Sequence, residues 1–129
     1  MKTVFFLDKE GNLARLGPKG KPASLAVAMQ ASWAKWRTLA AVLSVRDGRI
    51  PHDGGPGTCE LCSLFLTSGI PRCYGCPIYK HTGRPYCIGT AYARYCKAQK
   101  DGNSEKALVA ARAEVRFLKR VAKEAGVEL

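Results

Sequence analysis

Residues 104–126 read SEKALVAARAEVRFLKRVAKEAG, and this stretch decides the fold class because it has the pattern of a long amphipathic helix. Apolar residues recur at every third or fourth position, which places them on one side of an α-helix. They are Leu108, Ala111, Val115, Leu118 and Ala122. A second stripe is basic and consists of Arg112, Arg116, Lys119, Arg120 and Lys123. The stretch therefore predicts a helix with an apolar face and one basic edge, ended near Gly126.

Two further helices are expected upstream. Ser24 can cap a helix over residues 24–45. The apolar face of this helix would carry Leu25, Met29, Trp33, Trp36, Ala40 and Leu43. Thr90 can cap a shorter helix from Ala91 to about Lys100, which the breakers in 101–103 would end. Residues 91–126 are thus expected to form two helices.

The first twenty residues predict a β-hairpin. Residues 3–7 are β-prone, residues 8–12 contain turn formers, and residues 13–16 can return as a second strand. A Gly- and Pro-rich linker follows at 17–22, and the many breakers in 46–57 predict a flexible approach to the next segment. The expected fold is α+β and mostly helical, as one domain: hairpin in 1–20, helix in 24–45, metal-binding cysteine module in 57–90, and two helices in 91–126.

Length and charge limit the classes of function. The chain has 129 residues and a mass of 14.0 kDa, which suits a single domain. A net charge of +11 is high for this length, so either the partner carries negative charge or the charge serves solubility alone. No apolar run approaches the length that spans a bilayer, and the apolar start in residues 1–7 is too short for an export signal. A reducing cytoplasm is therefore expected, where thiols favour metal over disulfides.

Five cysteines form one regular array. Two C-x2-C pairs, CELC at 59–62 and CYGC at 73–76, are separated by ten residues, and ten more precede Cys87. Each pair can close a tight turn that directs both sulfurs at one centre. The expected zinc ligands are Cys59, Cys62, Cys73 and Cys76. Four thiolates close the coordination sphere, so the predicted site is structural.

Alternatives to this ligand set stay open. Cys87 could replace one of the four ligands, and His81 could complete a site of three cysteines and one histidine. Cys76-Pro77 is also typical of iron–sulfur proteins, so an iron–sulfur cluster is the alternative cofactor. The second pair could instead be ordinary buried cysteine, as is expected for Cys96 within the helix of residues 91–100.

Cations and tyrosines alternate through the middle of the chain. Between Leu61 and Lys100 there are six cations and no acidic residue. The interleaved aromatic residues are Tyr74, Tyr79, Tyr86, Tyr92 and Tyr95. This combination suits phosphate contacts and base stacking, although the cations could also neutralise the thiolates and the tyrosines could pack as a small core. The candidate nucleic-acid-binding residues are Arg72, Lys80, Arg84, Arg94, Lys97, Arg112, Arg116, Lys119 and Lys123.

From Lys35 onward, the order of motifs resembles a group of small cysteine-rich proteins of tailed bacteriophages and prophages. The residues that carry the resemblance are KWR at 35–37, DGG at 53–55, CELC at 59–62, CYGCPI at 73–78, TG at 82–83, CIGTAY at 87–92 and FL at 117–118. The resemblance covers residues 35 to about 118 and implies no particular activity. It implies that Cys87 belongs to the array in preference to Cys96, and that the protein acts in the cytoplasm of a bacterial host.

The expected function is that of a nonenzymatic phage or prophage accessory protein, in which a zinc-stapled module supports nucleic-acid binding, to DNA or RNA. The alternative is a protein-interaction module that docks on an acidic host protein, as an anti-defence or transcription-modulating factor. A metal-dependent enzyme would need a nearby acid or base, and Glu60 is the only carboxylate within the array.

Overall fold

The computed structural model of the chain describes residues 3–17, 22, 24–45, 49–53, 60–67, 70–71, 76–83, 87 and 89–129. In the ranges 60–67 and 70–71, the described side chains are those of Leu61, Leu64 and Phe65.

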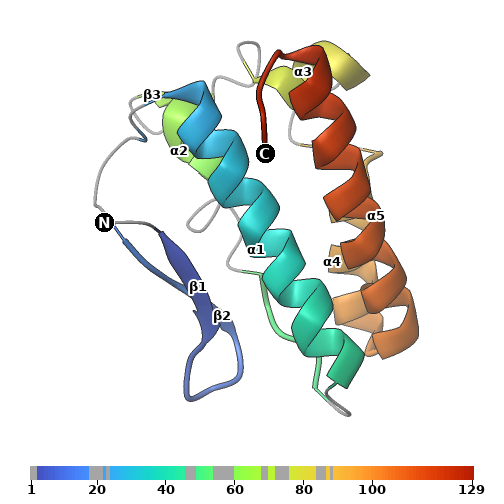
Figure 1. Ribbon diagram of the computed structural model, residues 1–129. Coiled ribbons are helices and arrows are strands. Elements are labelled where there is room, and N and C mark those ends of the chain that lie inside the picture. Colours follow the sequence, from blue (N-terminus) through green and yellow to red (C-terminus); the bar gives the residue numbers. More distant parts are fainter. Residues whose placement is uncertain are drawn as a thin grey trace.

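Three helices form the body of the molecule. They are α1 (Leu25–Val45), α4 (Ala91–Asp101) and α5 (Ser104–Glu124). Helix α5 runs antiparallel to α1 along most of its length and also packs along α4 (Figure 1). The expected α+β, mostly helical fold with an N-terminal hairpin is confirmed.

Helix α1 begins and packs as its sequence predicts. The Ser24 hydroxyl accepts a hydrogen bond from the backbone N–H of Val27 at 3.2 Å, which caps the first turn. Met29, Trp36 and Leu43 are buried, as the apolar spacing predicts. Leu25, Trp33 and Ala40 are partly buried and pack against the same core. The buried face therefore follows the helical period.

The turn between α4 and α5 is specified by two adjacent residues. Gly102 ends α4 with φ of 69°, a left-handed conformation that a glycine adopts without the Cβ penalty. The Asn103 side chain then accepts a hydrogen bond from the backbone N–H of Lys106, which caps α5. At the other end of α5, Gly126 has φ of 74° and follows the last turn. The predicted helix boundaries are thus met within one or two residues.

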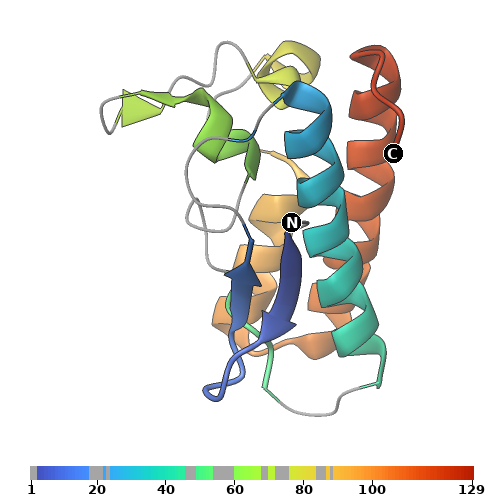
Figure 2. The same ribbon diagram turned by 60° about the vertical axis from the view of Figure 1, so that its left-hand side comes forward.

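The hairpin consists of β1 (Val4–Leu7) and β2 (Leu13–Leu16), paired antiparallel with Val4 opposite Leu16. The Asp8 carboxylate accepts hydrogen bonds from the N–H groups of Glu10 and Asn12 and so fixes the turn. Phe5 and Leu13 point into the same core as the helices. The hairpin lies against α1, on the side away from α5 (Figures 1 and 2).

Short elements occupy the described parts of the cysteine module. They are α2 (Glu60–Phe65), β3 (Leu66–Thr67), β4 (Ile70–Pro71) and α3 (Pro77–Thr82). Strands β3 and β4 pair antiparallel, and α3 contacts α5. The sequence did not predict the small strand pair or α3.

Residues 49–53 differ from the flexible approach that their sequence suggests. Ile50, Pro51 and Asp53 are buried. The His52 carbonyl accepts a hydrogen bond from the Leu13 N–H at 2.9 Å, which ties this segment to the hairpin. We call residues 49–53 the anchored segment. It has no regular secondary structure, but tertiary contacts hold it in place.

Candidate functional site

Cys76 is the predicted zinc ligand whose side chain the structure describes. It occupies the N-cap position of α3, is half-buried, and is followed by Pro77 in the first turn. Its carbonyl accepts the N–H of Lys80 at 3.1 Å, so its backbone is fixed by the start of the helix. The backbone of Cys62 lies within α2, while the side chain of Cys62 and the whole of Cys59 and Cys73 lie outside the described residues.

Cys87, the alternative ligand, has an unusual backbone. Its φ is +57°, in the left-handed region that costs a residue with a side chain roughly 1–3 kcal/mol. The Cys87 carbonyl accepts hydrogen bonds from both the hydroxyl and the N–H of Thr90, at 2.7 and 3.3 Å. The hydroxyl of Thr90 therefore points back to Cys87, and it does not cap α4 as the sequence suggested. These bonds hold Cys87 half-buried beside the helix bundle.

Cys96 lies on α4 and is half-buried, as expected for a small apolar residue. Burial raises the pKa of its thiol, although a hydrogen bond from the Tyr92 hydroxyl partly opposes this effect. The thiol form is therefore favoured, and a neutral thiol is a poor metal ligand. His81, the other alternative ligand, pairs through Nδ1 with Glu124 and lies edge-on to Phe117. Phe117 and Glu124 both belong to α5, so these two contacts hold the His81 ring against the C-terminal half of that helix.

A metal cluster is not assembled by the described side chains alone. Among them, no three His, Cys, Asp or Glu residues lie together in an arrangement that could hold a metal ion. Three of the four expected ligands have side chains outside this set, so the zinc site stays a prediction from spacing.

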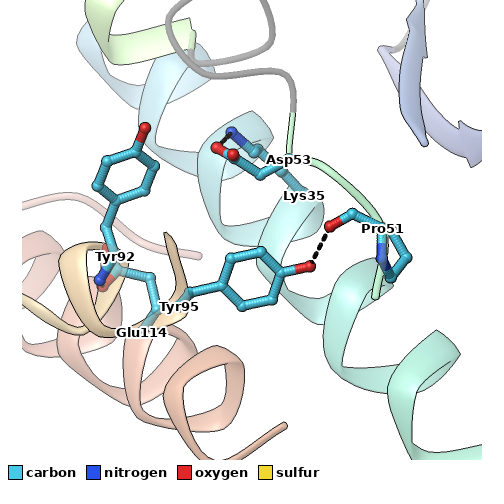
Figure 3. Close-up of polar contacts among 6 residues, drawn as sticks. All are labelled: Lys35, Pro51, Asp53, Tyr92, Tyr95 and Glu114. Atoms are coloured by element: carbon cyan, nitrogen blue, oxygen red, sulfur yellow. Dashed lines mark hydrogen bonds and ion pairs between the residues drawn. The ribbon is translucent and has the colours of Figure 1, made fainter. Parts of the chain in front are cut away.

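A buried ion pair attaches the anchored segment to α1. The Lys35 ammonium lies 3.3 Å from the Asp53 carboxylate, and both side chains are almost completely buried (Figure 3). The Lys35 nitrogen also lies 5.3 Å from the ring centroid of Trp36. Buried charges are rarely tolerated without such pairing, so this contact fixes the anchored segment against α1.

Two tyrosines of α4 complete this buried region. The Tyr95 hydroxyl donates to the Pro51 carbonyl at 2.6 Å, and the Tyr92 N–H donates to the Glu114 carboxylate at 3.0 Å (Figure 3). Both phenol rings meet Trp36 edge-on. Burial and, next, the negative charge of Asp53 raise the pKa of both phenols, so they stay protonated.

These contacts correct the expected role of one tyrosine. Tyr95 is 0% exposed, so it cannot stack on a base as the alternation of cations and tyrosines suggested. Tyr92 is half-buried against Trp36. Tyr79 is half-buried on α3, and Tyr74 and Tyr86 lie outside the described residues. Tyr92 and Tyr95 therefore fit the alternative interpretation, in which the tyrosines contribute to a core.

The basic ridge of α5 is placed as predicted. We use this name for Arg112, Arg116, Lys119 and Lys123, all of which are exposed. By the helical period they lie on the side opposite Glu114, Leu118 and Val121, which are buried. No residue that the structure describes forms an ion pair with any of the four. Their charges are therefore available to a ligand from solvent.

The remaining predicted cations are distributed over other elements. Lys80 is exposed on α3, and Arg94 is exposed on α4. Lys97 is exposed too, but its ammonium pairs with Asp101 at 2.9 Å and lowers the pKa of that carboxyl. Arg72 and Arg84 lie outside the described residues. The ridge of α5 is thus the part of the predicted interface whose exposure and spacing the structure describes.

Sequence reasoning did not assign roles to Lys35, Asp53 and Glu114, which are all buried. A signal was present for the first, because a lysine one residue before Trp36 borders the apolar face of the helix. Lys35 and Asp53 are also the first residues of the KWR and DGG motifs, and the structure brings these two residues together.

Comparison with known proteins gives no further assignment: no family model, no curated protein and no solved structure matches the chain. Within the described ranges, no helix combines the length and apolar character needed to cross a membrane.

Proposed function

We propose that this chain is a nonenzymatic nucleic-acid-binding protein that contacts DNA or RNA through the basic ridge of α5. Such a role suits an accessory protein of the phage or prophage type that its motifs resemble. The observation that supports it most is the exposure of four cations on one helix face, with no described acidic partner.

The spacing of the ridge suits a phosphate backbone. Arg112 and Lys123 are eleven positions apart, which corresponds to about 16 Å along a helix axis. Successive nucleotides of one strand rise about 3.4 Å, so the ridge is as long as roughly five nucleotide steps. The net charge of +11 would add a long-range attraction to any polyanion.

Fluorescence anisotropy with labelled single-stranded DNA, duplex DNA and RNA, each over a salt series, tests the proposal. Removing three ridge charges by the substitutions Arg116→Gln, Lys119→Gln and Lys123→Gln should reduce the slope of log K against log salt by about 3. A matched control removes three exposed cations elsewhere: Lys9→Gln, Lys100→Gln and Lys106→Gln.

The control separates ridge contacts from net charge because both variants lose the same charge. The proposal fails if no nucleic acid binds at low salt. It fails equally if the control loses as much affinity and slope as the ridge variant. Circular dichroism of both variants would establish that each is folded.

A second candidate function, docking on an acidic host protein, has its own support in the hairpin. Val4 and Leu16, which face each other across the strand pair, are 55% and 61% exposed, and Phe6 on the same face is 43% exposed. Charge could steer an acidic partner while this apolar face supplies affinity. Capture of one host protein by the nuclease-treated wild type, but not by a Val4→Ser, Phe6→Ser variant, would favour docking over nucleic-acid binding.

We also propose that Cys59, Cys62, Cys73 and Cys76 hold a structural zinc ion, with Cys87 as the alternative ligand. The two C-x2-C pairs and their ten-residue interval support this. Metal analysis of the purified protein should find one zinc per chain. Bound iron with visible absorption would contradict zinc and identify the iron–sulfur alternative.

A further inference from the structure

A groove runs along the seam where α1 and α5 lie side by side. Its volume is about 290 Å³, at the small end of ligand pockets. It is lined by Arg37, Ala40, Arg112, Val115 and Arg116. Arg112 and Arg116 belong to the ridge of α5, whereas Arg37 comes from α1 and was not among the candidate nucleic-acid-binding residues. The groove therefore extends the basic surface from one helix onto a second.

All the charged residues that line the groove are basic. Its lining contains three exposed guanidinium groups and no acidic residue. Arg112 and Arg116 are four positions apart on one helix, where like charges repel each other and destabilise the helix. An anion between the three groups would relieve this repulsion, so the site is better matched to a charged ligand than to water.

Arg37 is held in position by a neighbouring aromatic ring. The central carbon of its guanidinium lies 4.6 Å from the ring centroid of Trp33, one helical turn earlier. Stacking on an aromatic face restricts the long side chain before any ligand arrives. Less conformational entropy is then lost on binding, which is the advantage of a preorganised contact.

The chemistry of the lining favours a phosphate diester. Guanidinium groups bind phosphate oxygens through paired, charge-assisted hydrogen bonds. Ala40 and Val115 supply apolar surface between the arginines, which suits the carbon face of a sugar next to the phosphate. We propose that the groove binds one backbone phosphate of a nucleic acid, with Arg37 as a specific phosphate contact, an inference that rests on the proposed nucleic-acid binding.

Substitution of Arg37 tests this assignment without altering α5. The same anisotropy assay should show about a tenfold loss of affinity for Arg37→Gln and a reduction of the salt slope by about 1. Arg37→Lys keeps the charge but loses the paired geometry, so it should lose affinity with an unchanged slope. Lys100→Gln, an exposed cation on α4, serves as the matched single-charge control.

The outcomes distinguish the groove from the ridge. If Arg37→Gln binds like Lys100→Gln while the three-charge ridge variant loses affinity, the groove assignment is overturned and the proposed function stands. If the wild type binds no nucleic acid at low salt, both fail. A free-phosphate site would instead be shown if inorganic phosphate, at constant ionic strength, bound the wild type but not Arg37→Gln while both proteins bound the oligonucleotide equally, and this would overturn the assignment to a backbone phosphate.

Discussion

Replacing Asp53 with alanine should strongly destabilise the protein, because it leaves the buried Lys35 ammonium without this carboxylate. The two charged atoms are 3.3 Å apart, and the side chains of Lys35 and Asp53 are only 2% and 5% exposed. At this distance the attraction is about 5 kcal/mol for an effective dielectric constant of roughly 20. Desolvation offsets much of that attraction in the intact pair, but the remaining charge keeps its desolvation cost when the partner is removed.

The expected loss for Asp53→Ala is about 3–5 kcal/mol in the free energy of unfolding. Urea denaturation followed by circular dichroism would measure it. The exposed Lys97–Asp101 pair provides the control, since solvent screens it and removing it with Asp101→Ala should cost far less than Asp53→Ala. The double variant Lys35→Met, Asp53→Ala removes both charges and should be more stable than Asp53→Ala alone.

An Asp53→Ala variant as stable as Asp101→Ala would show that the buried Lys35 ammonium does not need this carboxylate. A double variant less stable than Asp53→Ala would likewise show that the unpaired ammonium is not the source of the loss.

Two further outcomes are expected. Since the folded state raises the pKa of the Tyr92 and Tyr95 phenols above the unfolded value of about 10, their contribution to stability is complete below pH 10 and is lost as pH rises above it. Urea denaturation at pH 9 and 11 should therefore show a smaller loss for Tyr92→Phe than for the wild type, and an equal loss would contradict the assignment. Asn103→Ala removes the cap of α5 and should cost about 1 kcal/mol, whereas Asn103→Ser should keep most of it; thermal unfolding compares the two.

The elements that sequence predicted well are those whose signals are local. Ser24, Gly102 and Asn103 act within a few residues of their own position, through a cap or a left-handed turn. The hairpin likewise follows from a turn flanked by β-prone residues. Such features depend little on the rest of the molecule, so their boundaries could be placed from the printed sequence.

The candidate site was only partly predictable, because its contacts join distant segments. The ridge of α5 follows from helical spacing alone, whereas Arg37 reaches the same groove only because α1 packs beside α5. For Tyr95, the sequence pattern suggested stacking on a base, whereas the structure buries the side chain. A tyrosine among cations has the same sequence pattern whether it faces solvent or the core. Its burial is set by the anchored segment, which was expected to be flexible.

The antiparallel pairing of α1 with α5 also bears on how the chain folds. Residues that meet across this seam, such as Arg37 and Arg112, are 75 positions apart, while α4 and α5 are joined by a two-residue turn. Closing a loop of that length costs roughly 4 kcal/mol in chain entropy, beyond a constant term, before its contacts form. The α4–α5 pair is therefore expected to form early, with α1 docking later. The phosphate groove, which needs both α1 and α5, would be among the last features to appear during folding.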